Sequence, residues 1–386
     1  MNTHRFLFTG DFAPCRAYSA ILEDSGIEVF GELTTELRNS DFAFLNLECP
    51  LTYSTLTVPK DGPSLKAPPS VARVIKEAGF SCVGLANNHI LDFQGNGLIE
   101  TTKALDNLSL MYCGAGKDIW EASAPVLMQV GSKKIAIFAV SESEFNIASD
   151  TEAGAAPIDV YKLTLDIINI KNSCDLIFVT VHGGNEFYEM PRPGLKKLCR
   201  YLIDIGVDGI FCHHPHVPGP FEIYKSKPIV YSLGNLIFDH SKPPEGWNSG
   251  YAFVVIFNDD NDMVDFEVIP YTQSVESKGL VLSKNKDKEN FLKYINNLNS
   301  ILLNDDSYTK NWNEYCVRNA DVVFTKTFFP LKFKGVRKLY PVLKYIYNSR
   351  FFRSKKIESL NSMRCESHLE LIKTSLELNV KRNNKN

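Results

Sequence analysis

Short apolar runs alternate with segments of helical period up to about residue 270 of the chain. Each apolar run has the length of a strand, and most are followed by a stretch in which apolar residues recur every three or four positions. The predicted strands are 6–11, 41–47, 80–85, 110–113, 125–130, 134–140, 175–181, 208–212, 229–233, 251–257 and 263–269. The predicted helices are 24–38, 69–78, 95–108, 158–171, 193–205 and 285–303. This alternation is typical of an α/β fold.

Polar side chains follow several predicted strands at the point where each strand ends. The residues concerned are Asp11, Glu48, Asn88–His89, His182 and the histidines of 213–216, with Asn235 after the run 229–233. In α/β chains the carboxyl ends of the strands form one edge, so residues far apart in the sequence meet there. We therefore expect the functional site at this edge.

The loop 213–216 holds the densest group of these residues. Three of the eight histidines, His213, His214 and His216, lie in four positions around Pro215. A single histidine at a strand end more often bonds to the backbone than to a metal. Three of them, with acidic residues and histidines at other strand ends, favour a metal site, because loop residues can converge on one point.

The residue types indicate which metals and which chemistry such a site would support. Carboxylate, amide and neutral imidazole ligands suit zinc, manganese or iron better than calcium. The group is larger than one tetrahedral ion requires, and two divalent ions about 3.5–4 Å apart with one bridging carboxylate would use all of it. Such a pair activates water and holds a phosphoryl group, while a further histidine can protonate a leaving oxygen.

Composition and charge limit the class of protein. Of 386 residues, 44% are hydrophobic and 23% are charged, as in a globular protein, and the net charge of −3 argues against a nucleic-acid partner. Nine scattered cysteines without a CxxC pair fit reduced thiols in a cytoplasm. The chain has no run of 18 apolar residues and no apolar region of signal-peptide length at its start. We expect a soluble, cytoplasmic protein.

Two segments interrupt or follow the α/β pattern. Residues 50–69 are rich in proline, threonine and serine, and their place beside Glu48 predicts a loop over the site, with 53–66 as a lid. The α/β domain is predicted to span 1–275, and 276–386 to form a helical extension with a disordered end over the last ten residues.

Part of this extension is strongly basic. Between 326 and 356 there are ten lysines or arginines, many phenylalanines and tyrosines, and no acidic residue. Its aromatic side chains either pack on the main domain or bind an anionic membrane surface, where aromatic burial and positive charge act together. The second interpretation predicts a peripheral protein at the inner face of the membrane.

The segments at the strand ends resemble the CapA family, which is named for poly-γ-glutamate capsule synthesis and placed in the calcineurin-like metallophosphatase superfamily. The matching segments are Gly10–Asp11, NLECPLT (46–52), LANNHILDFQGNGLIET (85–101), GAG (114–116), HGGNEFYEMPRP (182–193), IGVDGIFCHHPHV (205–217) and PIVYSLGNLIFD (228–239). The resemblance implies a metallophosphatase-like four-layer α/β/β/α sandwich, here with a helical C-terminal appendage. It also implies two divalent metal ions (Mn, Zn or Fe) at the edge identified above.

The resemblance assigns roles to individual positions. The implied metal ligands are Asp11, Glu48 as the bridge, Asn88, His182, His214 and His216. The implied catalytic residues are His89, which acts on the leaving group, and His213, which stands behind the ligands. The positions implied to line the substrate pocket or to orient other groups are Asp92, Glu186, Tyr231 and Asn235.

Three positions depart from the family pattern. Ala13 stands where the superfamily's first motif has a histidine, which implies one metal ligand fewer. Gly183 stands where the family usually has tryptophan, and Phe187 where it has tyrosine, which implies a wider and less aromatic pocket. Anchored members carry an N-terminal membrane segment, a role that the basic stretch 326–356 could take over here.

The sequence leaves two functions open. The first is a metal-dependent hydrolase that cleaves a phosphoester or amide-type bond in a capsule or surface polymer or its precursor. The second is a non-catalytic assembly factor for a polymer synthase, in which an incomplete metal site only holds the loops. Ala13 favours the second function, whereas the retained histidine cluster favours the first.

Overall fold

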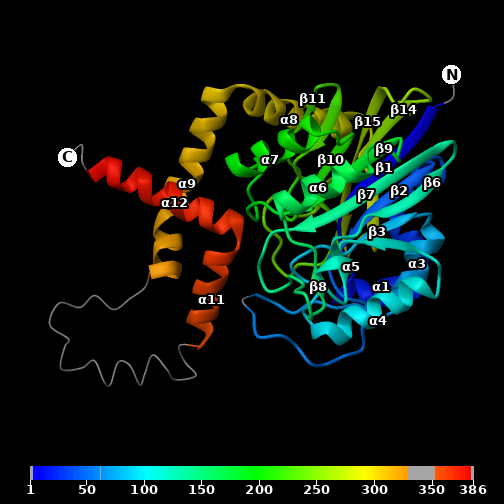
Figure 1. The fold of residues 1–386 in the computed structure, drawn as a ribbon, viewed down its shortest axis with the longest axis horizontal. Coiled ribbons are helices and arrows are strands. Elements are labelled where there is room, and N and C mark those ends of the chain that lie inside the picture. Colours follow the sequence, from blue (N-terminus) through cyan, green and yellow to red (C-terminus); the bar gives the residue numbers. More distant parts are fainter. Residues whose placement is uncertain (1–2, 61, 329–352, 384–386) are drawn as a thin grey trace.

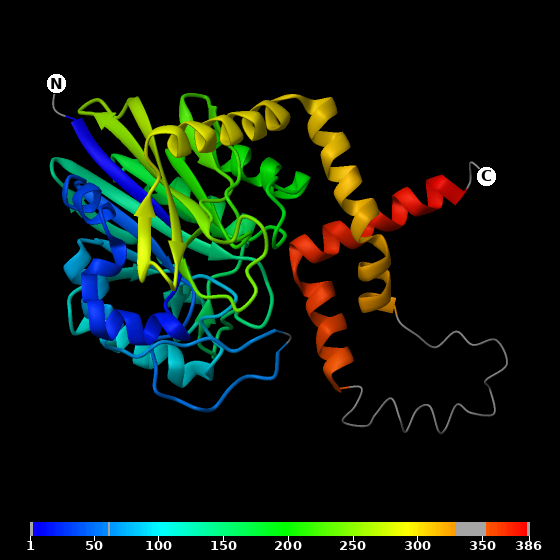
Figure 2. The ribbon, with the colours of Figure 1, turned by 180° about the vertical axis from the view of Figure 1, so that it is seen from behind.

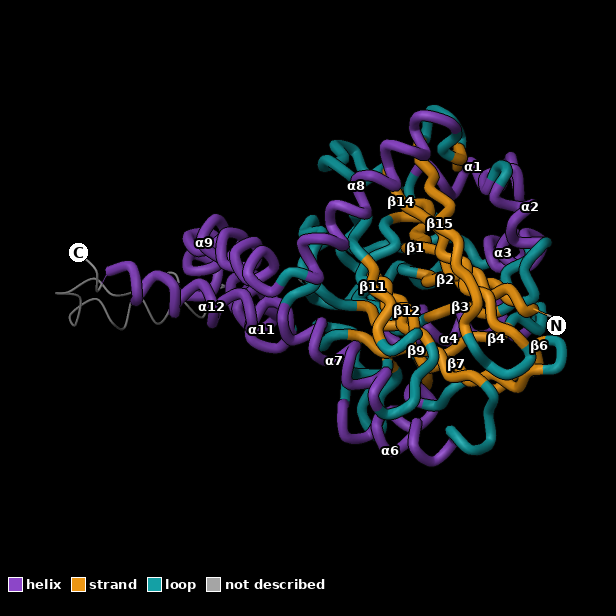
Figure 3. Tube along the Cα trace, turned by 90° about the horizontal axis from the view of Figure 1, so that it is seen from above, coloured by secondary structure: helices purple, strands orange, loops and turns teal. Residues whose placement is uncertain are grey.

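Two β-sheets pack face to face at the centre of the molecule, and helices cover the outer face of each (Figures 1 and 3). This computed structural model describes residues 3–60, 62–328 and 353–383. The layers follow in the order α/β/β/α, and a group of C-terminal helices extends from one side (Figure 1). The four-layer sandwich with a helical appendage that the sequence predicted is therefore confirmed.

The first sheet has eight strands, in the order β16-β15-β14-β1-β2-β3-β4, with β13 also paired to β1. Strands β1 to β4 are parallel, whereas β14 to β16 are antiparallel. The strands are β1 (Thr3–Ala13), β2 (Phe42–Leu47), β3 (Cys82–Gly84), β4 (Met111–Cys113), β13 (Asn235–Phe238), β14 (Ser249–Asn258), β15 (Met263–Ser274) and β16 (Gly279–Leu282). The outer face carries α1 (Ala17–Ser25), η1 (Gly26–Phe30), α2 (Leu33–Arg38), α3 (Val71–Ala78) and α4 (Gln94–Asp106).

The second sheet has six strands, in the order β11-β12-β10-β9-β7-β6. Its middle strands are parallel, and each edge is closed by an antiparallel partner. The strands are β6 (Val126–Val130), β7 (Lys133–Ser141), β9 (Leu176–His182), β10 (Gly209–His213), β11 (Phe221–Tyr224) and β12 (Lys227–Val230). Helices α6 (Val160–Ile170) and α7 (Pro193–Asp204) cover its outer face, and the short elements α5 (Ile119–Ser123), β5 (Ala115–Gly116) and β8 (Gly154–Ala155) lie in the connections.

Aromatic side chains fill the space between the two sheets. Phe6 and Phe8 of β1 point into this space, whereas Leu7 between them faces the helices. The ring of Phe8 stacks on Phe211 of β10 with 3.5 Å between the centroids, and Phe6 lies 5.3 Å from Phe178 of β9. Burial of these rings holds the two layers together and so fixes the relative position of their strand ends.

The single helix predicted for 24–38 is wrong, because the structure has the three short pieces α1, η1 and α2 there. Gly26 and Gly31 separate them with φ angles of 55° and 52° and strongly negative ψ, a conformation that favours glycine. A Cβ on Gly31 would also lie 2.6 Å from the carbonyl oxygen of Leu280. The apolar side chains keep nearly helical spacing through the breaks, so the pattern suggested one helix.

The apolar run 229–233 also differs from its prediction, since it does not form one strand. Strand β12 ends at Val230 in the second sheet, and β13 begins at Asn235 beside β1 in the first. The chain thus crosses from one sheet to the other over residues 231–234. This crossing brings the histidine loop, which precedes it, next to β1.

The C-terminal extension begins after β16. Its helices are α8 (Asn285–Leu303), α9 (Asp305–Phe328), α11 (Arg353–Arg364) and α12 (Glu366–Asn383). The hairpin α11–α12 packs on α9 and reaches back toward the loops at the strand ends (Figure 2). The end of the chain, predicted to be disordered, is helical as far as Asn383. The domain boundary after residue 275 stays a prediction, although β16 still belongs to the first sheet.

Most of the basic stretch 326–356 lies outside the described residues, which end at 328 and resume at 353. The membrane contact predicted for it stays a prediction. Among the helices that the structure describes, none is long and apolar enough to cross a membrane.

Candidate metal centre

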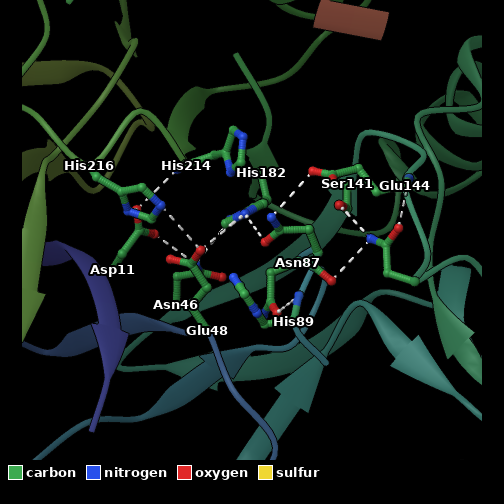
Figure 4. Close-up of polar contacts among 12 residues, drawn as sticks. Asp11, Asn46, Glu48, Asn87, His89, Ser141, Glu144, His182, His214 and His216 are labelled. Carbon is green, nitrogen blue, oxygen red and sulfur yellow. Dashed lines mark hydrogen bonds and ion pairs between the residues drawn. The ribbon is translucent and has the colours of Figure 1, made fainter. Parts of the chain in front are cut away.

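The predicted ligands lie together where strands of both sheets end (Figure 4). The first sheet contributes the ends of β1, β2 and β3, and the second contributes β9 and the loop after β10. Gly10 permits the close contact between them, since a Cβ there would lie 2.0 Å from the carbonyl oxygen of Gly234. That same carbonyl accepts a hydrogen bond from the Asp11 amide at 3.0 Å. The chain crossing is thus fastened directly to the strand end that carries Asp11.

Glu48 is the central residue of this cluster (Figure 4). Its side chain is completely buried, and neither carboxylate oxygen has a hydrogen-bond partner among the described residues. Its Oε1 lies 3.5 Å from Nε2 of His216 and 3.6 Å from Nε2 of His182. Two sets of possible ligands share it: one adds His214 and His216, the other Asp11 and His182, each with its ligand atoms within 4.8 Å. A residue common to both sets is placed as a bridging carboxylate would be.

Burial and neighbouring charges set the ionisation of the cluster. Burial raises the pKa of Glu48 well above its usual value, and the Asp11 carboxylate adds to this effect. Burial would also raise the pKa of Asp11, but the hydrogen bond with His216 and nearby histidine charges outweigh it and lower that pKa. Burial lowers the pKa of His182 well below its usual value, so its imidazole is neutral at pH 7.

Asn235 orients His216. Its Nδ2 donates to the carbonyl oxygens of His216 at 3.2 Å and Trp247 at 3.0 Å, so its Oδ1 is turned toward His216 Nδ1 at 3.0 Å. An amide oxygen can only accept, so in the neutral ring the proton sits on Nδ1. The lone pair is then on Nε2, which faces Glu48. This contact supports the orienting role that was predicted for Asn235.

His182 lies between two amide side chains. Oδ1 of Asn88 is 3.0 Å from its Nε2, and Nδ2 of Asn46 is 3.2 Å from its Nδ1. Asn46 also donates to Oδ1 of Asp11 at 2.8 Å, so it links Asp11 of the first sheet to His182 of the second. The sequence interpretation did not include Asn46. Its position two residues before Glu48 could have identified it, because a strand presents such residues on the same face.

The loop after β10 holds two predicted ligands in unusual backbone conformations. The φ angles are 97° at His214 and 60° at His216, which are unfavourable for residues with a side chain. The backbone N–H of His214 donates to Oδ2 of Asp11 at 3.0 Å, whereas its ring Nδ1 is buried without a partner in the described structure. The backbone is thus anchored while a ring nitrogen remains available.

His213 lies behind the cluster and has a different role from the one predicted. Its Nε2–H donates to the carbonyl oxygen of Thr9 at 3.0 Å, and burial lowers its pKa. The ring therefore ties β10 to β1. A catalytic role does not agree with this placement, because the donor nitrogen is already bonded to the backbone.

His89 and Asp92 form a buried pair under the loop 53–66. Oδ2 of Asp92 lies 2.7 Å from Nδ1 of His89 and accepts the backbone N–H of Leu65 at 2.7 Å, and its Oδ1 accepts from Lys60. Burial lowers the pKa of His89, and the positive charge of Lys60 lowers it further. Asp92 thus orients His89 and also fastens the loop over it. Lys60 could not be predicted, because an irregular loop has no periodicity from which side-chain direction follows.

Two residues predicted to line the pocket are placed differently from each other. Glu186 is solvent-exposed, and its carboxylate interacts electrostatically with His214, His216 and His89. It therefore lies beside the cluster. The ring of Tyr231 is buried, and its hydroxyl donates to Glu222 at 2.7 Å. Because the ring is buried and its hydroxyl is bonded to a residue of β11, Tyr231 does not line a pocket.

The pocket is not widened at Gly183 in the way that the sequence suggested. A Cβ there would lie 2.7 Å from the Glu142 side chain, which occupies the space. Aromatic rings are also present, since Trp247 lies 5.0 Å from the ring of His216 and 6.0 Å from that of Phe187. At the other departure, Ala13 packs in the apolar core and offers no ligand atom.

The donor set fits a divalent metal ion. A buried carboxylate without partners is unfavourable unless a cation or a proton balances it. The free oxygens of Glu48 and the unpartnered nitrogen of His214 are donors that a zinc, manganese or iron ion would accept. These residues therefore indicate the use of divalent metal, with Glu48 shared by the two candidate sets.

Comparison with known proteins gives matches over the same part of the chain. The model of a family described as bacterial capsule synthesis protein PGA_cap matches residues 5–240. The capsule biosynthesis protein CapA of Bacillus anthracis is 30% identical over 273 residues, which cover 68% of this chain and 65% of that protein. The PGA biosynthesis protein CapA of Bacillus subtilis (strain 168) is 30% identical over 271 residues, which cover 68% of this chain and 70% of that protein. The match thus spans slightly less than two thirds of the Bacillus anthracis protein.

Solved structures with a similar arrangement are more distant. A phosphatase from Mycoplasma pneumoniae has a TM-score of 0.47 and 16% identity, with 76% of this chain and 97% of that chain covered. A 5'-nucleotidase precursor from Thermus thermophilus has a TM-score of 0.44 and 14% identity, with 78% of this chain and 60% of that chain covered.

Proposed function

Because the chain belongs to the PGA_cap family of bacterial capsule synthesis proteins, we propose that it is a divalent-metal-dependent hydrolase in the assembly of a capsule or surface polymer. Its substrate would be that polymer or a precursor, and the bond cleaved a phosphoester or an amide-type bond. Relatives are named for capsule biosynthesis, PGA biosynthesis or polyglutamine synthesis, which supports a polymer as the substrate class.

The unpartnered carboxylate of Glu48 carries this proposal. Two divalent ions that share Glu48 would be held by Asp11, His182, His214 and His216, with the amide oxygen of Asn88 as a further donor. Bound there, the metal would supply an activated water and a positive charge for the developing oxyanion. Asn235 and Asn46 keep the imidazoles of His216 and His182 in fixed orientations.

His89 is the residue that we expect to handle the proton. Its Nδ1 is turned to Asp92, so Nε2 is the ring nitrogen left to exchange a proton with water or a leaving oxygen. Burial and the positive charge of Lys60 lower the pKa of His89, so its ring is neutral at pH 7. The loop 53–66, fastened at Asp92, limits access of water to this pair.

Alanine at His182 or His216 is expected to remove most of the bound metal. Each substitution removes an imidazole from one of the two candidate ligand sets that share Glu48. Metal content, measured by elemental analysis without chelator, should fall from about two ions per chain to one or fewer. Hydrolysis of a generic phosphodiester in the presence of Mn²⁺ should fall at least about 10²-fold. His240→Ala is the matched control, since that ring contacts Lys242 and Trp247. Unchanged metal content in both alanine variants would contradict the ligand assignment.

A non-catalytic assembly factor is the second candidate, and one observation favours it. Ala13 leaves one ion with a ligand fewer than the family pattern has, and its methyl group packs in the core. A wild-type protein that binds metal and hydrolyses neither phosphodiesters nor amide-linked polymer would favour a scaffold for a polymer synthase.

We also propose that the basic stretch 326–356 makes a peripheral contact with an anionic membrane. In flotation with vesicles that contain anionic lipid, the full chain should float, and glutamine at the lysines and arginines between 332 and 350 should abolish this at low salt. These substitutions leave α11 and α12 unchanged. Equal flotation of the neutralised variant would mean that the stretch does not bind the membrane.

A further inference from the structure

The turn between α11 and α12 lies toward the loops of the main domain (Figure 2), and residues 365–367 there bond to residues 142–143, which follow β7 of the second sheet. Oε2 of Glu142 accepts the backbone N–H of Ser367 at 3.0 Å and the thiol of Cys365 at 3.2 Å. In return, Oε2 of Glu366 accepts the backbone N–H of Ser143 at 2.9 Å. Three consecutive hairpin residues thus bind two consecutive residues at the end of β7.

A buried arginine strengthens this contact. Arg192 donates to Oε1 of Glu142 from Nε at 3.1 Å and from Nη2 at 2.9 Å, and Nη1 donates to Glu370 of α12 at 2.5 Å. The space for Glu142 exists because residue 183 is glycine, as a Cβ there would lie 2.7 Å from it. A charged group buried in this way needs its partners, so the hairpin is firmly held at this edge.

From the docked hairpin a line of hydrogen bonds leads to the predicted metal ligand Asn88. Nδ2 of Asn361, a buried residue of α11, donates to Oε2 of Glu144 at 3.0 Å. The other oxygen of Glu144 accepts from Nδ2 of Asn88 at 3.2 Å. Oδ1 of Asn88 is then left to face His182 Nε2 at 3.0 Å. The backbone N–H of Glu144 donates to Oδ1 of Asn146 at 3.0 Å, which holds the main chain at this position.

The chemistry of Glu144 decides which way the Asn88 amide points. A carboxylate accepts hydrogen bonds and donates none, so Asn88 must present its NH₂ group to Glu144 and its oxygen to the cluster. The oxygen is the atom that a divalent cation binds. Without a partner on its far side, the carboxylate could turn away and the amide could flip. Asn361 supplies that partner from a helix more than two hundred residues away in the sequence.

We propose that the C-terminal hairpin is part of the metal centre, with Asn361 as a positioning residue that orients Asn88 through Glu144. This inference rests on the metal site of the proposed function, and it does not depend on which bond the protein cleaves.

The test exchanges the hydrogen-bond donor at position 361 and the acceptor at position 144, and it measures metal binding. Mn²⁺ is titrated into chelator-treated full-length protein and followed by calorimetry. Asn361→Asp places two carboxylates against each other and should weaken Mn²⁺ binding by about 10–100-fold, the range typical for residues that orient metal ligands. In the double variant E144Q/N361D, the amide at 144 can donate to position 361 and accept from Asn88. Affinity should then return close to that of the wild type.

Glu366→Gln is the matched control, because it disturbs the neighbouring contact of the hairpin with Ser143 and leaves Glu144 untouched. It should bind Mn²⁺ as the wild type does. If N361D does not fold, Asn361→Ala removes the donor without adding charge and should show the same weakening. Wild-type affinity in the single variants, or a double variant as weak as N361D, would overturn the role of Asn361. A wild-type chain that takes up no Mn²⁺ would overturn the metal site itself, whereas absent hydrolysis with intact binding would overturn only the proposed reaction.

Discussion

Glutamine in place of Glu48 is expected to stabilise the metal-free protein and to weaken its stabilisation by metal. The buried carboxylate has no hydrogen-bond partner among the described residues, and such a group destabilises the folded state by about 1–3 kcal/mol. Glutamine has nearly the same shape and no charge to bury. In the presence of metal the variant should instead be less stable than the wild type, because it lacks the ligand that both candidate sets share.

The same substitution should change the pH dependence of stability. Burial raises the folded-state pKa of Glu48 above the value of 4.5 expected for the unfolded chain. The unfolded state therefore releases this proton first, and the metal-free protein loses stability as the pH rises from 4.5 toward the folded-state pKa. Glu48→Gln removes this loss.

Thermal melts with EDTA and with Mn²⁺, at pH 6 and pH 8, would measure both effects. The wild type should gain about 2.7 kcal/mol at a Mn²⁺ concentration of 100 times its dissociation constant, and Glu48→Gln should gain little. Glu77→Gln, at an exposed position of α3, controls for the change of charge. A variant that melts below the wild type in EDTA, or gains equally from Mn²⁺, would show that Glu48 is not a metal-bridging carboxylate.

Replacement of His89 by glutamine is expected to reduce turnover by about 10²–10⁴-fold and to leave the metal content unchanged. The imidazole is the group next to the cluster whose free Nε2 can exchange a proton, since its Nδ1 is bonded to Asp92. Glutamine retains a polar side chain but cannot take up a proton near neutral pH. The measurement combines single-turnover hydrolysis of a generic phosphodiester with elemental analysis of the same sample.

His4→Gln is a suitable control, because His4 begins β1 at the other end of the strand and contacts Ser132 and Asp259. Loss of metal in His89→Gln would instead make His89 a ligand. Unchanged turnover would assign the proton transfer to another group.

The position of the site could be predicted from the sequence because it depends on local patterns. Strand length and the polar residues at strand ends are visible in short windows, and parallel strands necessarily collect those ends at one edge. Asp11, Glu48, His182 and the histidines of 213–216 were expected at this edge for that reason, and the structure groups ligand atoms of Glu48 with those of Asp11 and His182 and with those of His214 and His216.

The parts that could not be predicted depend on contacts between distant segments. Glu142 and Ser367 are separated by more than two hundred residues, and no periodicity relates them. The glycines that break the helix over 24–38 keep an apolar spacing around them, so the pattern concealed the breaks. Gly183 appeared to widen the pocket, because the carboxylate that fills its space, that of Glu142, belongs to a segment about forty residues earlier in the chain.

The cluster lies across the seam between the two sheets, since Asp11 and Glu48 come from one sheet and His182, His214 and His216 from the other. An ion bound there would act as a cross-link between two layers that are otherwise joined by packed aromatic rings and by hydrogen bonds such as those from His213 to Thr9 and from His214 to Asp11. Such a link forms after the layers have docked, so it should slow unfolding more than it speeds folding. Metal supply would then control the lifetime of the folded protein as well as its chemistry.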